Sequence, residues 1–188
     1  MKTAESLAPG PLEPVHVIID VCSLEEEQSK EFPSVRLCYA TLLEAIAQGR
    51  PWRSTAVDSH SARRQEAHAD LGELGVLVLR NGWSGFDVRQ KEVDVELALQ
   101  MDEASRTSPT ETIILVSGDR DFLPAVERAR RRGTRVEIAG FSASTSKGLQ
   151  RSATRFHVLD SLRMWVNRFP AATAPPTAEI LDAAEAAA

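Results

Sequence analysis

Short apolar, β-branched runs alternate with amphipathic segments along the middle of the chain, and this alternation constrains the fold more than any other feature. The clearest run is TIILVS, Thr112 to Ser117, which is almost wholly apolar, as a central strand of a parallel sheet should be. Further strands are predicted at residues 15–20, 54–59, 76–80 and 134–140, with an edge strand at 156–160. The pattern predicts an α/β fold with a mainly parallel sheet covered on both faces.

The segments between these runs predict the helices. We expect helices over about 33–48, 62–74, 91–105, 121–132 and 146–152, and a last one over 161–169. Pro33 suits a first helical turn, and Gly49 with Pro51 ends that helix. The acidic stretch SLEEEQSKE, residues 23–31, and the glycine-bearing stretch NGWSGFD, residues 81–87, are predicted to be loops.

Length and composition bound the domain organisation. The 188 residues, of which 43% are hydrophobic and 26% charged, suffice for one ordinary domain with tails. We expect a flexible N-terminal tail at 1–14, a domain at 15–169, and a Pro/Ala-rich C-terminal tail at 170–188. No apolar run approaches the roughly 20 residues that span a bilayer, and the N-terminus lacks a signal-peptide pattern. The sequence therefore predicts a cytoplasmic protein that does not associate with membranes.

Charge and cysteine content limit the kinds of site. The net charge of −5 argues against a simple basic clamp on nucleic acid, although the two tails carry most of it. Cys22 and Cys38 are expected to be free thiols, since cytosolic thiols stay reduced. The four histidines are scattered and no CxxC occurs, so a zinc site is not indicated. Any metal ion must therefore be held by oxygen.

Four aspartates are the candidate ligands. Asp20 ends the first predicted strand and Asp119 follows the strand at 112–117, so both project from the carboxyl edge, where open α/β sheets bind ligands. Asp121 begins the next helix, and Asp94 lies in the first turn of the helix expected from residue 91. Crowded carboxylates do not all ionise cheaply, and a hard cation such as Mg²⁺ or Mn²⁺ removes that cost. The pattern predicts a divalent metal site.

Each aspartate also has a simpler explanation. Asp121 suits a helix N-cap, and Asp94 suits the first turn of a helix. Taken alone, either is better explained in that way. Asp20 is different, because an acid that closes a strand as apolar as VHVII seldom serves packing. Asp119, within SGDRDF directly after a buried strand, is the most site-like of the four.

Three sequence motifs carry a family resemblance. IID at 18–20, KEVDVELALQMD at 91–102 and ILVSGDRDFLPAV at 114–126 resemble the NYN domain, the LabA-like branch of the PIN-like nuclease superfamily. The stretch GTRVEIAGFSASTSKGL, residues 133–149, is also similar to this family. The resemblance covers about residues 15–156.

The resemblance implies a Rossmann-like three-layer α/β/α sandwich and metal-dependent endonucleolytic cleavage of single-stranded or structured RNA. It assigns metal binding and catalysis to Asp20, Asp94, Asp119 and Asp121, with Mg²⁺ or Mn²⁺ activating a water. Ser23, Ser117 and Gly118 would support the site. Ser23 stands where the family usually has an asparagine, and Ala153–Thr154 stands where it usually has an Ala-Asp pair. These two departures favour the alternative of a catalytically weak or inactive RNA-binding or scaffold protein.

Candidate RNA contacts are basic or aromatic. Arg89, Lys91, Arg120 and Lys147 could meet phosphate oxygens, and Trp83 could stack on an unpaired base. A solvated charge, or a ring that caps the core or a dimer contact, is the simpler explanation for each. Small nucleases often dimerise, so a homodimer is a further hypothesis.

Two other enzyme classes fit less well. A phosphatase of the haloacid dehalogenase kind needs a second acid two residues after the first, but the chain reads Asp20-Val21-Cys22. A nucleophilic Cys22 has no histidine near it in the sequence to activate it.

Overall fold

A six-stranded sheet runs through the centre of the protein. This computed structural model describes residues 13–33, 35–59, 65–81, 86–108, 112–161 and 165–167. The strands pair in the order β4 (Leu77–Asn81), β3 (Trp52–Ser59), β1 (Val15–Asp20), β5 (Thr112–Val116), β6 (Val136–Gly140) and β7 (Arg155–Val158). Each pairing is parallel, which confirms the predicted α/β fold.

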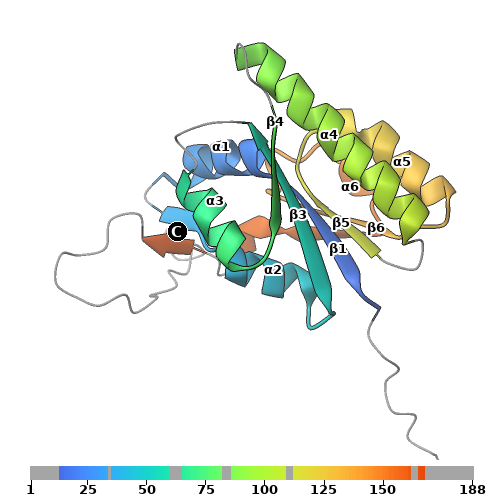
Figure 1. The fold of residues 1–188 in the computed structure, drawn as a ribbon, viewed down its shortest axis with the longest axis horizontal. Helices are drawn as coiled ribbons and strands as arrows, with labels where there is room; N and C mark the ends of the chain where they lie inside the picture. The colour runs from blue at the N-terminus through green and yellow to red at the C-terminus, as the bar shows by residue number, and fades with distance from the viewer. Residues whose placement is uncertain are drawn as a thin grey trace, which may run out of the picture.

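Helices cover both faces of this sheet (Figure 1). One face carries α1 (Val21–Glu31), α2 (Tyr39–Ala47) and α3 (Gln65–Glu73). The other carries α4 (Phe86–Thr107), α5 (Leu123–Arg131) and α6 (Lys147–Ser152). The three-layer sandwich is therefore confirmed. A small antiparallel sheet of β2 (Val35–Leu37) and β8 (Trp165–Asn167), with the 3₁₀ turns η2 (Arg120–Phe122) and η3 (Leu159–Ser161), completes the described elements.

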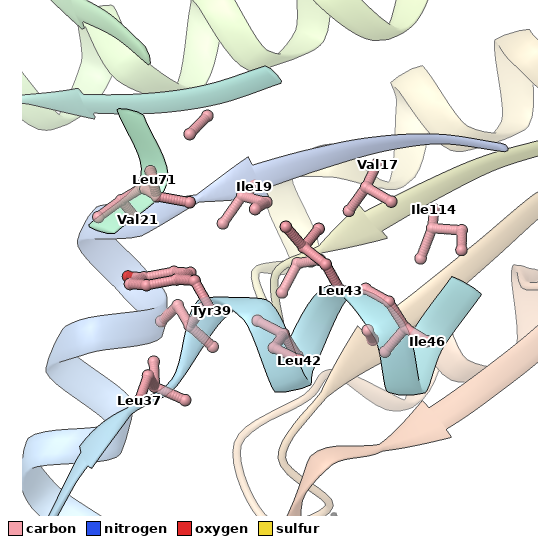
Figure 2. Close-up of a cluster of buried hydrophobic side chains, with 14 of the residues drawn as sticks. Val17, Ile19, Val21, Leu37, Tyr39, Leu42, Leu43, Ile46, Leu71 and Ile114 are labelled. Carbon is pink, nitrogen blue, oxygen red and sulfur yellow. The ribbon is translucent and has the colours of Figure 1, made fainter. Parts of the chain in front are cut away.

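The two apolar cores explain why the strands are so hydrophobic. Every residue of β1 and of β5 is buried, because each strand has helices above and below it. Figure 2 shows the core on the α1–α3 face, where α2 packs its apolar side against β1 and β5. The labelled side chains are Val17, Ile19, Val21, Leu37, Tyr39, Leu42, Leu43, Ile46, Leu71 and Ile114. Because side chains fill both faces, a polar group can meet solvent most easily at the strand ends.

The acidic stretch at 23–31 is helical, so the predicted loop is wrong. Asp20 is the N-cap of α1, and Leu24 and Gln28 turn inward. The Gln28 Nε2 atom donates to the carbonyl oxygens of Phe32 and Val35, each at 2.6 Å, which ties the end of α1 to β2. The helix expected from Pro33 begins instead at Tyr39, since residues 35–37 form β2.

The helix predicted over 161–169 is also wrong, because residues 165–167 form β8 and pair antiparallel with β2. α4 begins at Phe86, within the predicted loop at 81–87, and its start is therefore earlier than expected. Residues 1–12 of the predicted N-terminal tail and all of the predicted C-terminal tail, 170–188, lie outside the described residues. In the described part of the chain, no helix combines the length and the apolar character needed to cross a membrane.

A buried ionic network joins β6, β7 and the segment that follows α2. Both guanidinium Nη atoms of Arg50 donate to the carboxylate of Glu137, at 2.9 and 2.8 Å, and the Nε2 atom of His157 lies 2.7 Å from the same carboxylate. Burial would raise the pKa of Glu137, but the hydrogen bonds from His157 and Arg50 outweigh it and lower this pKa to about 2. The network therefore stabilises the fold through an ionised Glu137.

Replacing Glu137 by alanine is expected to cost about 3 kcal/mol of folding free energy, because the largely buried Arg50 guanidinium loses its carboxylate partner. The carboxylate's contribution is present above its unfolded pKa of about 4.5 and is lost as the pH falls toward 2. Urea unfolding at pH 7 measures the cost. The control is Glu127→Ala, which removes an exposed ion pair with Arg131 and should change stability by less than about 1 kcal/mol. Equal effects of the two substitutions would contradict this account.

Candidate metal centre

The carboxyl ends of β1 and β5 bring the first and third predicted acids to one place. β1 and β5 are hydrogen-bonded neighbours, and Ile19 pairs with Val116 in their register. In the sheet, β3 and β4 lie on one side of β1, and β5, β6 and β7 lie on its other side. Asp20 and the segment Ser117 to Asp119 therefore stand at the switch point of the sheet, where folds of this kind bind their ligands.

Ser117 links these two acids directly. Its hydroxyl group donates to the Oδ2 atom of Asp20 at 3.1 Å and accepts from the backbone N–H of Asp119 at 3.2 Å. The backbone N–H of Asp121 in turn donates to the Oδ1 atom of Asp119 at 2.9 Å, which caps η2. A chain of hydrogen bonds thus runs from Asp20 through Ser117 and Asp119 to Asp121.

Asp20 is fully buried, and its carboxylate is held in place from two sides. The backbone N–H of Ser23 donates to its Oδ1 atom at 3.1 Å, and the Ser23 side chain also hydrogen-bonds to it. Burial raises the pKa of Asp20 to about 6, the hydrogen bonds from Ser23 and Ser117 oppose this rise, and the negative charge of Asp94 adds to it. The protein therefore holds a carboxylate here at a cost in free energy.

The other three acids differ in their surroundings. Asp94 is half-buried on α4 and lies well inside that helix rather than in its first turn, so the expected helix-terminus explanation is wrong. Its charge acts on Asp20 across the α4 face of the sheet. Asp119 is partly buried, and Asp121 is exposed in η2. The four acids thus come from three segments, the end of β1, α4, and the η2 turn with its N-cap.

The donor chemistry fits a hard divalent cation, because the groups at this edge are carboxylate and hydroxyl oxygens and the carboxylates repel one another. These side chains do not form a preformed metal-binding site. Among the residues that the structure describes, no three His, Cys, Asp or Glu side chains lie close enough together to hold a metal ion. Binding an ion would therefore require side chains to turn toward it, and Asp119 and Asp121 are the acids with room to do so.

Glu27 is a further carboxylate at this edge, and it is not among the four candidate aspartates. It is half-buried on α1, and its Oε1 atom lies 3.1 Å from the position that a β-carbon on Gly118 would occupy. Burial raises the pKa of Glu27, and the negative charges of Asp119 and Glu31 add to this rise. A hydrogen bond from Ser144 and the positive charge of Lys30 oppose it. Helical spacing from Ser23 would have revealed it, but that stretch was predicted to be a loop.

Gly118 is packed so closely that a side chain there would force its neighbours to shift. A β-carbon there would lie 3.1 Å from the Cα atom of Thr145 as well as from Glu27. Gly118→Ala is therefore expected to displace the Asp119 loop and to lower both the melting temperature and any metal-dependent activity, by about tenfold for the activity. Gly72→Ala is the control, because nothing lies within 4 Å of its added carbon. An active, equally stable Gly118→Ala variant would contradict the close packing.

The structure describes the side chains of two of the five candidate RNA-binding residues. Arg120 and Lys147 are exposed near the site, in η2 and at the start of α6. Trp83 and the side chains of Arg89 and Lys91 lie outside the described residues. Thr154 lies far from the site, since its N–H donates to the carbonyl oxygen of Val136 at the first residue of β6. The departure at Thr154 therefore removes no acid from the Asp119 edge.

The two cysteines are free thiols, as predicted. Cys22 is buried and its Sγ atom lies 3.4 Å from the Ser59 Oγ atom. The burial of Cys22 does not favour a nucleophilic role for this thiol.

The chain is similar to known proteins in its sequence and in its fold. The family model described as "NYN domain" matches residues 14–160. The chain is 39% identical over 71 residues to uncharacterized protein MJ0482 of Methanocaldococcus jannaschii, a match that covers 37% of this chain and only 30% of that relative. The crystal structure of VPA0982, a protein of unknown function from Vibrio parahaemolyticus, superposes with a TM-score of 0.69 at 23% identity, over 81% of this chain and 96% of the other. That likeness shows the fold alone.

Proposed function

The chain belongs to the NYN domain family, a nuclease-like family with RNA-related functions, and from this premise we propose that it is a metal-dependent endoribonuclease. The observation that carries the proposal is the hydrogen-bonded link from Asp20 through Ser117 to Asp119 at the switch point of the sheet. A purely structural role does not explain why a fully buried carboxylate is kept at this edge beside Asp94.

Asp20, Asp94, Asp119 and Asp121 would hold Mg²⁺ or Mn²⁺, which supplies charge neutralisation and an activated water for attack on the phosphodiester. Ser23 and Ser117 keep the Asp20 carboxylate fixed and oriented. Asp121, the exposed acid of the four, is the one best placed to orient or deprotonate water from the solvent. Arg120 and Lys147 offer cations to phosphate oxygens of the RNA.

A catalytically inactive RNA-binding protein of the same fold is the second candidate. The observation in its favour is that the described side chains do not already form a three-ligand metal cage. Ser23, which stands in place of the family's asparagine, does not favour it, because this residue makes hydrogen bonds that hold Asp20.

Incubation with end-labelled single-stranded and hairpin RNA tests the proposal. We expect cuts with Mn²⁺ and with Mg²⁺, none with chelator, and none with the Asp119→Asn variant under either ion. RNA binding by both proteins without any cutting would support the inactive alternative. Cuts that persist with chelator and in the variant would come from a contaminant and would overturn the site assignment.

A further inference from the structure

Glu27 lies against the loop that carries Asp119. It is on α1, the helix whose N-cap is Asp20, and it lies about two turns from that cap. Its Oε1 atom approaches Gly118 so closely that an added β-carbon would stand 3.1 Å from it. Because Gly118 lies between Ser117 and Asp119, the carboxylate of Glu27 packs on the backbone of the segment that forms the site.

A second loop fixes Glu27 in this place. Ser144, in the segment between β6 and α6, hydrogen-bonds to the Glu27 side chain. The next residue, Thr145, packs on Gly118, and the N–H of Ser146 donates to the Gly118 carbonyl oxygen at 3.0 Å. Thr145 is buried, and its Oγ1 atom has no hydrogen-bond partner among the described residues. Three segments therefore meet around Glu27, and they hold its charge beside Asp119.

We infer that Glu27 is a positioning residue of the metal centre, which strengthens cation binding by the Asp20 and Asp119 edge through its charge. This inference rests on the proposed function. A negative charge held next to Asp119 adds to the potential that attracts a cation, and it acts through Asp119 and Gly118. Glu27 also adds a carboxylate from α1, a helix that contains none of the four candidate aspartates. Residues beyond the ligands themselves commonly alter metal affinity in this way.

Glu27→Gln separates charge from packing, because glutamine has nearly the same shape and still accepts a hydrogen bond from Ser144. Calorimetric titration with MnCl₂ is expected to show an affinity about tenfold lower than that of the wild-type protein, with an unchanged melting temperature. Glu26→Gln is the matched control, since Glu26 is the exposed neighbour on the same helix, and its affinity should stay at the wild-type value. Glu27→Asp retains the charge and should recover most of the affinity.

The outcomes distinguish a failure of the positioning role from a failure of the proposed function. Equal Mn²⁺ affinities for the wild-type, Glu27→Gln and Glu26→Gln proteins would overturn the positioning role and leave the proposed function intact. Lower affinity and a lower melting temperature in both Glu27→Gln and Glu27→Asp would show a packing role and would also overturn it. A wild-type protein that binds no Mn²⁺ would remove the proposed function together with this inference.

Discussion

Asp119→Asn is expected to lower the rate of Mn²⁺-dependent RNA cutting by at least about a hundredfold, while the fold is retained. Asp119 caps η2 by accepting the N–H of Asp121, and asparagine accepts the same hydrogen bond with similar preference at an N-cap. The substitution therefore removes the charge without removing the turn. The first-order rate of loss of a labelled RNA, measured under single-turnover conditions, gives the effect.

Glu103→Gln is the matched control, because it removes one exposed negative charge from α4 away from the sheet edge. Its cutting rate should stay within about twofold of the wild-type rate. If the two variants cut equally fast, Asp119 has no role in the reaction, and the proposed site is wrong even if the protein is a nuclease.

Asp20→Asn is expected to abolish cutting and yet to stabilise the metal-free protein at neutral pH, by up to about 3 kcal/mol. Burial and Asp94 raise the pKa of Asp20 to about 6 from 3.8, so the ionised group destabilises the folded state above that pH. The asparagine side chain is neutral and can still accept from the Ser23 N–H. Functional residues often lower the stability of the folded protein when its ligand is absent.

The difference in stability between the wild-type protein and Asp20→Asn should depend on pH. Below about pH 4 Asp20 is protonated in both the folded and unfolded states, and the two proteins should be equally stable. As the pH rises from about 4 to about 6, the folded wild-type protein loses stability relative to the variant, and above about pH 6 the difference stays constant. Urea unfolding at pH 4 and pH 8 with chelator measures the difference. A variant that is less stable than wild type at pH 8 would show that the buried carboxylate is needed for the fold itself.

Mn²⁺ should reverse the order of stability. A ligand that binds only the folded state stabilises it by mass action, and this gain should be large in the wild-type protein and small in Asp20→Asn. Melting temperatures with and without Mn²⁺ at pH 7.5 provide the comparison.

The strands and the edge that carries the site were predictable from the sequence. Apolar runs such as TIILVS report burial on both faces of a sheet, and an acid that follows such a run must stand at a strand end. Neighbouring placement of the strands that end at Asp20 and precede Asp119 was a hypothesis, and the register of β1 with β5 confirms it.

The missed elements depend on contacts that are distant in sequence. β2 and β8 are short, and within the described residues they pair with each other alone. Neither strand has a clear pattern of its own, and each falls in a stretch that the sequence predicts to be helical. α1 was missed because its three adjacent glutamates conceal the spacing of Leu24 and Gln28. That error also concealed Glu27, since only a helix places this residue over Gly118.

The position of a bound ion tests the central claim most directly. Crystals of the protein soaked in MnCl₂ should show an anomalous scattering peak at the carboxyl edge of β1 and β5, in contact with the carboxylates of Asp20 and Asp119. The same soak of Asp119→Asn crystals should lack that peak. Peaks found only elsewhere on the wild-type protein, or no peak at a Mn²⁺ concentration that supports RNA cutting, would contradict the metal centre proposed for this edge.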